Sequence, residues 1–490
     1  MNTTNKESLK NHTISGIFWT FSERILAQVV SFIVSIVLAR FLLPAEYGII
    51  AIVTVIISIC NVFVTSGFST SLIQKSEADD TDFSTVFYFG IVFSLILYGG
   101  IYFIAPVISG FYEYDELTSV IRVMSVTVVI SSVKSIQHSY VTRAMQFRKF
   151  FWSTLGGTLA SAAVGIVMAC LAFGVWALVA QYITNNLIDT VILWFTVKWR
   201  PKLKFSLDRL KGLLSFGWKV LVSNLLMTLY QDLRTIIIGT VYTSEDLAYY
   251  QKGRQFPSLI VTNINTAISS TLLPVMSKMQ DNIAAIKNAI CRFLKIASYI
   301  LMPLMVGLAV VAEPLVRLLL TEKWMACVPY LQLMCISHAF LPLQTANTQA
   351  VLAVGRSDVS LKAETIKRTV NILILLVTFR ISVMALVLGE ILSTIVSLMV
   401  NTIVSKKLFG YGTLAQLKDI LPCILLSLVM GAGIYPIALL GLSDIITIML
   451  QMIAGIIIYT SLSLIFKVES FTYLLATVKP MLGRFLKKKS

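Results

Sequence analysis

Long apolar runs separated by short polar turns are the dominant pattern along the chain. A helix that crosses a bilayer needs about 20 mostly apolar residues. Segments that meet this requirement lie at 14–39, 45–73, 84–109, 117–142, 150–172, 174–197, 212–241, 246–274, 289–312, 327–353, 360–380, 382–404, 419–440 and 443–466. Only helices and closed barrels satisfy their backbone polar groups in lipid, and these segments lack the alternation of barrel strands. The pattern therefore predicts an all-α integral membrane protein with about 14 transmembrane helices.

The composition supports this prediction and excludes a water-soluble protein. Of the 490 residues, 57% are hydrophobic and only 13% are charged, and the mean hydropathy is +0.83. A soluble protein carries about 25% charged residues. The six cysteines lie in or beside apolar runs and form no C-x-x-C pair, so we expect small buried side chains and no metal or disulfide framework.

The basic residues are unevenly distributed. The chain has 40 lysines and arginines against 24 acids, a formal net charge of +16. With a cytoplasmic N-terminus, about 26 basic residues fall in cytoplasmic segments and about four on the other side, namely Arg40, Arg317, Lys323 and Arg380. The positive-inside rule then predicts a multi-pass protein with both termini in the cytoplasm.

The chain also matches itself at an offset of 200 residues. Glu46-Tyr47-Gly48 aligns with Asp246-Leu247-Ala248, and the segment 69–73 aligns with 269–273. An even number of spans separates the copies, so they share one orientation, as in transporters built from two six-helix halves. We therefore predict two parallel-repeat six-helix lobes at 1–198 and 212–405, a basic cytoplasmic linker at 199–211, two further helices within 406–466 and a basic tail at 467–490.

Charged side chains within the predicted spans are the most informative feature. An ionised group at mid-bilayer costs about 2.5–3.5 kcal/mol and faces a cavity or a partner. The basic residues are Arg24, Arg122, Lys134, Lys219, Arg234, Lys252, Arg254, Lys295, Lys367 and Arg368, and the acids are Glu23, Asp189, Asp232, Glu364 and Glu390. Pairing leaves about five positive charges uncompensated, which points to an anionic cargo or a hydrated space.

Two polar stripes carry some of these charges. One follows the first span through Arg24 and Gln28, and the other follows the eighth through Lys252, Gln255 and Asn263. We interpret both stripes as walls of a hydrated cavity, with interhelical hydrogen bonding and snorkelling Lys and Arg ends as the alternative. The predicted substrate-binding residues are Arg24, Gln28, Asn224, Lys252, Gln255, Asn263, Lys367 and Arg368.

Two acids within spans are candidates for ion coupling, Asp232 and Glu364. An intramembrane carboxylate can carry a proton or a sodium ion, although a salt bridge from Asp232 to Arg24 or Lys252 is an equal alternative. Glu364 and Arg368 are spaced i,i+4 and could pair, which would leave Lys367 uncompensated. The sequence contains no phosphate loop, zinc motif or nucleophile elbow. We therefore expect no enzyme activity, metal or cofactor, and a proton or sodium gradient as the energy source.

Several short runs resemble one transporter family. They are Leu38 to Gly48 (LARFLLPAEYG), Arg143 to Arg148 (RAMQFR), Gly174 to Val179 (GVWALV) and Leu273 to Lys278 (LPVMSK). Together they are similar to the polysaccharide-transport branch (Wzx-like, of the colanic-acid and teichuronic-acid exporter type) of the multidrug/oligosaccharidyl-lipid/polysaccharide (MOP) flippase superfamily. The resemblance covers roughly residues 10–410.

The resemblance implies a V-shaped, MATE-like fold of two lobes that opens alternately to either side of the bacterial plasma membrane. It implies export of undecaprenyl-pyrophosphate-linked oligosaccharide repeat units, expected to be anionic, from the cytoplasmic to the outer leaflet. Membrane lipids, a polysaccharide polymerase and glycosyltransferases are the implied partners, and nucleic acid is not.

Two other functions remain open from the sequence. One is a transporter of the same superfamily with a different substrate, either a drug antiporter or a peptidoglycan-precursor flippase. Fewer cationic residues in the cavity would favour a drug antiporter, because drug substrates are often cations themselves. The remote alternative is a membrane glycosyltransferase or polymerase, which would require a nucleotide-binding domain or a large external loop that the sequence lacks.

Overall fold

The computed structural model describes residues 19, 23, 25–75, 77–112 and 114–472, and these are helical with short connections and no strand. Ten helices are long and apolar enough to cross a membrane, or eleven if the bent pair Leu207–Ser215 and Gly217–Val241 forms one span. The prediction of an all-α membrane protein is confirmed. The first predicted span, 14–39, falls partly outside the described residues, and its described part belongs to the shorter apolar helix Ile25–Phe41.

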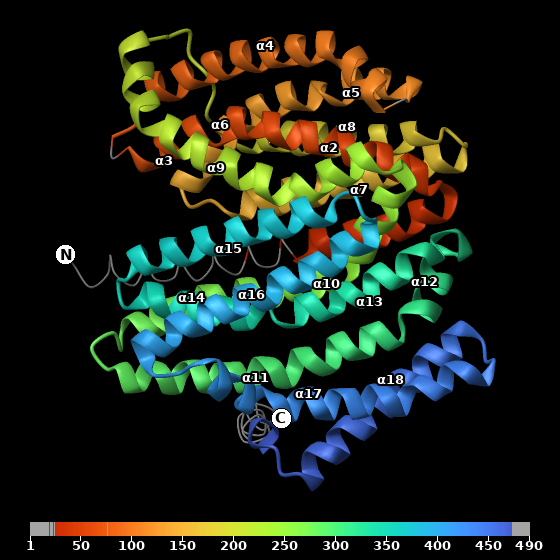
Figure 1. Cartoon of the computed structure of the whole chain (residues 1–490). Helices are drawn as coiled ribbons and strands as arrows, with labels where there is room; N and C mark the ends of the chain where they lie inside the picture. Colours follow the sequence, from red (N-terminus) through yellow and green to blue (C-terminus); the bar gives the residue numbers. More distant parts are fainter. Residues whose placement is uncertain (1–18, 20–22, 24, 76, 113, 473–490) are drawn as a thin grey trace, which may run out of the picture. The chain divides into compact units, whose positions relative to one another are not determined.

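The chain packs as two compact units that divide between Ala248 and Tyr249. After Ile25–Phe41, the N-terminal unit contains α2 (Pro44–Thr65), α3 (Gly67–Gln74), α4 (Asp80–Tyr112), α5 (Asp115–Met124), α6 (Val126–Arg143), α7 (Arg148–Cys170), α8 (Val175–Thr196) and α9 (Leu207–Val241). Figure 1 shows these helices from red to yellow-green, with α4, α5 and α6 side by side.

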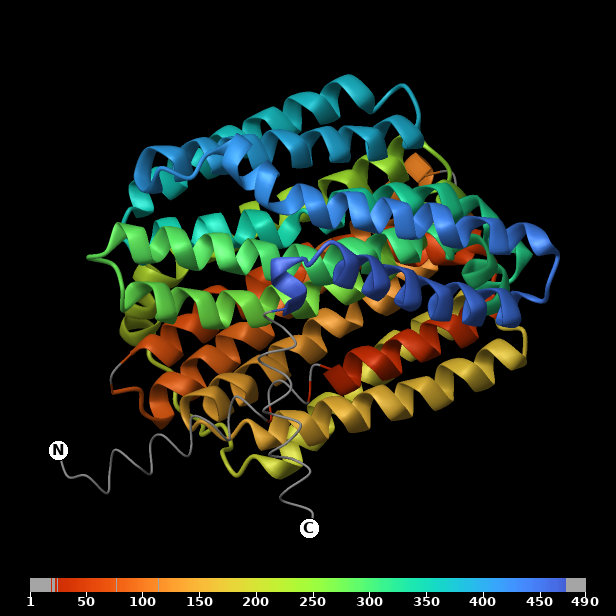
Figure 2. The same cartoon turned by 90° about the horizontal axis from the view of Figure 1, so that it is seen from below.

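The helix α10 (Ser244–Ser277) begins in the first unit and continues into the second. The C-terminal unit then contains α11 (Ile283–Val310), α12 (Ala312–Leu320), the 3-10 helix η1 (Glu322–Cys327), α13 (Val328–Ala339), α14 (Leu341–Ala353), α15 (Ser357–Thr378), α16 (Val383–Phe409), α17 (Thr413–Ile434), the 3-10 helix η2 (Tyr435–Leu440) and α18 (Asp444–Ile465). Figure 2 shows α11, α17 and α18 of this unit, in green and blue, as neighbouring rods.

Some predicted spans are divided between two helices, and others are too polar to count among the ten helices that could cross a membrane. The span 117–142 is divided at Ser125 between α5 and α6, and 327–353 is divided at Phe340, just before the proline at position 2 of α14. Both α8 and α15 form full helices but lie outside the ten apolar ones. In α15 the reason is the charged first half, which places four ionisable side chains between positions 362 and 368.

The division by packing differs from the predicted lobes at α9. We assigned this helix to the second lobe, but it packs along α2 and α3 of the N-terminal unit. The backbones of α9 and α3 approach each other closely, because a Cβ on Gly217 would lie only 2.8 Å from the carbonyl oxygen of Gly67. Ser71 Oγ also donates to the Leu213 carbonyl at 3.1 Å. The lobes derived from the repeat remain a prediction.

The predicted linker 199–211 is docked on the N-terminal unit along its length. Its last residues belong to α9, and the backbone N–H of Lys202 donates to Ser84 Oγ at 2.9 Å. The Lys202 ammonium lies 2.5 Å from a carboxylate oxygen of Asp80. Beside it, the backbone N–H of Asp82 and the Arg209 guanidinium lower the pKa of Asp79 to about 2. The segment therefore behaves as part of the first unit.

Each unit has its own apolar core. In the N-terminal unit, the buried side chains of α5 and α6, such as Leu117 and Val128, pack on Val53 and Ile57 of α2. In the C-terminal unit, Ile290 and Leu294 of α11 pack on Leu343 of α14 and Ile420 of α17. The α17 and α18 helices, predicted as two further helices after the second lobe, pack against each other, and both contact α11 within this unit.

A glycine contact in the first unit gives a stability prediction. A Cβ on Gly48 of α2 would lie 1.9 Å from the carbonyl oxygen of Ser244, which is too close for any side chain. We expect Gly48→Ala to lower the free energy of unfolding by about 1–3 kcal/mol because the backbones must separate. Gly99→Ala in α4 is the matched control, since a Cβ there meets nothing within 4 Å. Thermal unfolding in detergent, monitored by size-exclusion chromatography, measures both variants, and equal midpoints would contradict the assignment.

Candidate functional site

The N-terminal unit contains a polar seam between α2 and α9. Asp232, on the face of α9 that meets α2, accepts a hydrogen bond from Ser58 Oγ at 2.8 Å. Thr54 and Thr65 lie on α2 at helical spacing from Ser58 and donate to carbonyls of their own helix. The predicted ion-coupling carboxylate, Asp232, therefore lies between two helices. One of them, α2, also carries a buried acceptor, Asn61 Oδ1, with no hydrogen-bond partner among the described residues.

Lys252 is enclosed in the C-terminal unit. It is only 4% exposed, and its Nζ lies 5.5 Å from the centre of the Trp324 ring. The close approach of α10 to α13 explains this burial, since a Cβ on Gly253 would lie 2.8 Å from Tyr330 Cβ. Trp324 itself is fully buried in η1. A buried ammonium facing an aromatic ring is stabilised by the ring's negative face, which is a cation–π interaction.

The acid and base pairing on α15 differs from the expectation. Glu364 forms an ion pair with Lys367, three residues along the helix, so Lys367 is not left uncompensated. Residues three and four apart are both neighbours on a helix surface, and here the i,i+3 partner makes the contact. Lys367 is 9% exposed. One turn further, Asn371 accepts a hydrogen bond from Ser393 of α16 at 2.9 Å.

The other predicted substrate-binding residues occupy intermediate positions. The half-buried ones are Gln28, Asn224, Gln255, Asn263 and Arg368. Asn263 donates to the Leu259 carbonyl of its own helix at 2.9 Å. Arg24 lies outside the described residues. The structure therefore brings Asp232 together with Ser58 and Glu364 with Lys367, and the substrate-binding role of the set stays a prediction.

One buried ion pair was missed by the sequence analysis. Lys134 of α6 lies 2.9 Å from the Asp189 carboxylate of α8, and Asp189 is 9% exposed. We placed both residues among the charged side chains within the predicted spans but did not pair them. They are opposite charges on the fourth and sixth predicted spans, and the 55 positions between them leave no local pattern. One turn from Lys134, His138 stacks on Phe150 with ring centres 4.3 Å apart.

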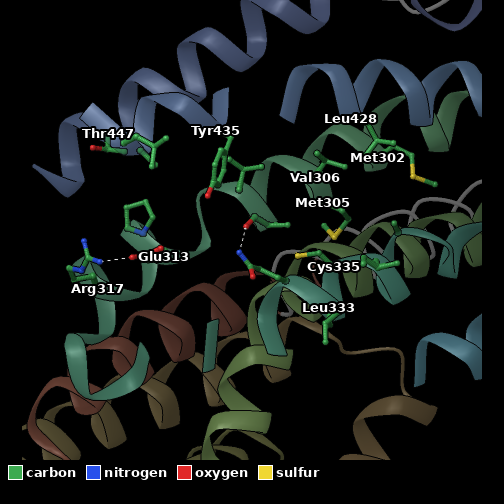
Figure 3. A pocket seen from close by; sticks show the side chains of 18 of the residues that line it. Met302, Met305, Val306, Glu313, Arg317, Leu333, Cys335, Leu428, Tyr435 and Thr447 are labelled. Atoms are coloured by element: carbon green, nitrogen blue, oxygen red, sulfur yellow. Dashed lines mark hydrogen bonds and ion pairs between the residues drawn. The ribbon is translucent and has the colours of Figure 1, made fainter. Parts of the chain in front are cut away.

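The C-terminal unit also contains a pocket of about 920 Å³ between α11, α12, α13, α17, η2 and α18. Figure 3 shows Glu313 and Arg317 at one end and Met302 and Leu428 at the other. Sequence reasoning missed this pocket, because no local pattern links Arg317, which lies between two predicted spans, to the other helices that line it.

Comparison with known proteins identifies the family. Residues 37–329 match the model of a family described as polysaccharide biosynthesis protein. The chain belongs to this family. It is 24% identical over 358 residues to the teichuronic acid biosynthesis protein TuaB of Bacillus subtilis, covering 72% of this chain and 74% of that protein. It is 22% identical over 405 residues to the lipopolysaccharide biosynthesis protein WzxC of Escherichia coli, covering 81% of each chain.

Solved structures show the fold. The lipid II flippase MurJ in an inward closed conformation matches with a TM-score of 0.73 at 17% identity, over 92% of this chain and 98% of that one. An inward-facing MATE family transporter of the MOP superfamily matches with a TM-score of 0.60 at 15% identity, over 79% of this chain and 96% of that one. The fold is that of these membrane transporters, and the family match confirms the predicted polysaccharide-biosynthesis family.

The buried ion pair of the N-terminal unit gives a double-mutant prediction. Lys134→Met leaves the Asp189 carboxylate without its cation, and we expect a loss of about 3 kcal/mol in unfolding free energy. This loss is at the lower end of the usual range for removing one partner of a buried ion pair, because a quarter of the Lys134 side chain is exposed. The double variant Lys134→Met with Asp189→Asn should recover at least half of the loss.

Denaturant titration of the purified variants measures both effects. Lys219→Met is the control, because this α9 lysine is exposed. A double variant as unstable as Lys134→Met alone would show that the uncompensated Asp189 carboxylate is not the cause of the loss.

Proposed function

We propose that this protein is a secondary-active flippase that moves undecaprenyl-pyrophosphate-linked oligosaccharide repeat units from the cytoplasmic to the outer leaflet of the bacterial plasma membrane. The observation that carries the proposal is the combination of a polysaccharide-biosynthesis family match with the fold of the lipid II flippase. A further relative is named succinoglycan biosynthesis transport protein ExoT, of Rhizobium meliloti. The proposal includes cytoplasmic termini and, as partners in the membrane, a polymerase and glycosyltransferases.

The charge of the buried positions supports an anionic cargo. Lys252 and Lys367 are both enclosed, and cations in a water-poor environment bind phosphate oxygens through short, charge-assisted hydrogen bonds. In the proposed mechanism Lys252 leaves the face of Trp324 to bind the pyrophosphate, while Gln255 and Asn263 on the same helix bind sugar hydroxyls. Lys367 can exchange its partner Glu364 for the cargo.

The energy source in this proposal is an ion gradient that acts through intramembrane carboxylates. An ionised carboxylate only accepts hydrogen bonds, whereas a protonated one also donates. Protonation or sodium binding at Asp232 would therefore weaken its contact with Ser58 and loosen the seam between α2 and α9. Glu364 can respond in the same way through Lys367. A ligand shifts a conformational equilibrium only through such differential interactions.

The fold likeness to the lipid II flippase also favours a second candidate, a peptidoglycan-precursor flippase. Both cargoes share a polyprenyl pyrophosphate anchor and differ in the sugar and peptide that it carries. Competition between labelled lipid-linked oligosaccharide and unlabelled lipid II in the same vesicles would separate the two.

The enclosed lysine gives the first functional prediction. We expect Lys252→Ala to reduce flipping of a labelled lipid-linked oligosaccharide in proteoliposomes at least tenfold, because the anion loses its cation. Lys252→Arg should retain part of the activity. Lys219→Ala, which removes an exposed lysine of α9, is the matched control. Arg24→Ala is expected to match Lys252→Ala. Transport at the wild-type rate in the Lys252→Ala and Arg24→Ala variants, at equal protein amounts, would overturn the binding assignment.

The intramembrane carboxylates give the second functional prediction. Flipping should fall when both the proton and the sodium gradient across the vesicle are dissipated. Asp232→Asn should make the remaining rate independent of the gradient, since an amide does not titrate. Asp246→Asn, an acid in an exposed side-chain contact at the start of α10, is the control. Undiminished transport without any gradient would remove Asp232 and Glu364 from the coupling mechanism while leaving the cargo assignment intact.

A further inference from the structure

The pocket of the C-terminal unit is not used by the proposed transport mechanism. Its volume of about 920 Å³ lies in the upper part of the range for ligand pockets, about 300–1,000 Å³. Most of its walls are aliphatic or sulfur-containing, including Met302, Met305, Cys335 and Leu428. The amide of Gln332, at the wall, donates to the Ala309 carbonyl at 3.1 Å. The interior therefore offers an apolar surface that suits a hydrocarbon chain.

One end of the pocket is charged and is built from three residues of two helices, α12 and α18. Arg317 of α12 binds Glu313 of the same helix with Nη2–Oε1 at 2.7 Å, and Asp444 of α18 with Nη1–Oδ1 at 3.2 Å. Two carboxylates against one guanidinium give this end a formal charge of −1. We call these three residues the charged mouth.

The charged mouth can bind both a further anion and a further cation. A guanidinium has five N–H donors, and the two contacts to Glu313 and Asp444 leave others available. The Glu313 side chain is 58% exposed, so its carboxylate can accept a further cation. A headgroup that carries an ammonium and a phosphate would satisfy both. A polyanionic pyrophosphate would instead meet a site with excess negative charge.

We propose that this pocket binds an aminophospholipid of the membrane, with one acyl chain between α11, α13 and α17, its ammonium on Glu313 and Asp444, and its phosphate on Arg317. The ligand is a resident lipid that differs from the cargo in headgroup charge, so the inference does not rest on the proposed function. Methionines suit the chain region because their unbranched, polarisable side chains adapt to an irregular ligand.

Binding would link parts of the unit that the pocket separates. The acyl chain would fill space between α11 and the turn η2, where apolar walls otherwise lack contact partners. The headgroup would reinforce the link that the Arg317–Asp444 ion pair already makes between α12 and the start of α18. Since a ligand that binds only the folded state stabilises it, aminophospholipid should raise the melting temperature.

Photolabelling of the full-length protein tests the site directly. The probe is phosphatidylethanolamine with a diazirine on one acyl chain, in phosphatidylcholine nanodiscs, with labelled peptides identified by mass spectrometry. We expect labelling of the α11 peptide with Met302 and Met305 and of the α17 peptide with Leu428. Unlabelled phosphatidylethanolamine should compete at least fivefold better than phosphatidylglycerol.

Two pairs of variants separate the charged mouth from the apolar interior. Glu313→Gln combined with Asp444→Asn should lower labelling at least fivefold, whereas Glu322→Gln, an exposed acid of η1, should not. Ala438→Trp should block the pocket that Ala438 lines, whereas Ala432→Trp on the exposed face of α17 should not. Helix content by circular dichroism and the size-exclusion profile show that each variant is folded.

The outcomes decide between three occupants. Loss of labelling in the charged-mouth and Ala438 variants, with competition by phosphatidylethanolamine, supports the proposal. Equal competition by phosphatidylglycerol, or unchanged labelling in the Glu313 and Asp444 variant, overturns it. Labelling that only an undecaprenyl pyrophosphate competes away would assign the pocket to the cargo. If these peptides are not labelled at all, the proposed lipid site is refuted. None of these results depends on transport activity.

Discussion

The cost of burying a charge in the membrane is the constraint on which the rest of this structure depends. Each ionised group there needs a partner, since water is absent from the hydrocarbon region. The chain meets this requirement in three ways: an ion pair between helices for Lys134 and Asp189, an ion pair within one helix for Lys367, and an aromatic ring for Lys252. The Lys134 ion pair and the Lys252 ring contact therefore hold their helices to neighbouring elements by electrostatics as well as by shape.

Close backbone packing makes those partnerships possible. Lipid chains are as apolar as leucine, so helices in a bilayer associate through small residues and polar contacts more than through hydrophobic burial. Gly253 illustrates the connection, because its contact with α13 brings the neighbouring Lys252 to the ring of Trp324. On α7, a Cβ at Gly157 would lie 3.1 Å from the Cβ of Asp189, so the glycine leaves room for the acid that pairs with Lys134.

The sequence predicted the helices well and their partnerships poorly, for a physical reason. A long apolar run specifies a helix by itself, so the spans at 84–109 and 443–466 agree with α4 and α18. A partner on another helix leaves no local pattern. The pair of Lys134 and Asp189 spans 55 positions and the contact of Arg317 with Asp444 spans 127, so neither could be read from spacing. The spacing on α15 allowed Glu364 to pair with Arg368, four residues along, and it pairs with Lys367, three residues along, because both neighbours are within reach.

Within the C-terminal unit, the two proposed ligands would meet different surroundings. Lys252 is enclosed beside an aromatic ring, which stabilises a cation without cancelling its charge. At the charged mouth, Arg317 is already neutralised by Glu313 and Asp444, so only a headgroup that brings its own positive charge gains from both signs. A pyrophosphate-linked cargo and an aminophospholipid both combine a long hydrocarbon chain with a phosphate, and shape alone separates them weakly. Under the two proposals, the two carboxylates of the charged mouth would favour the aminophospholipid over the pyrophosphate-linked cargo at that site.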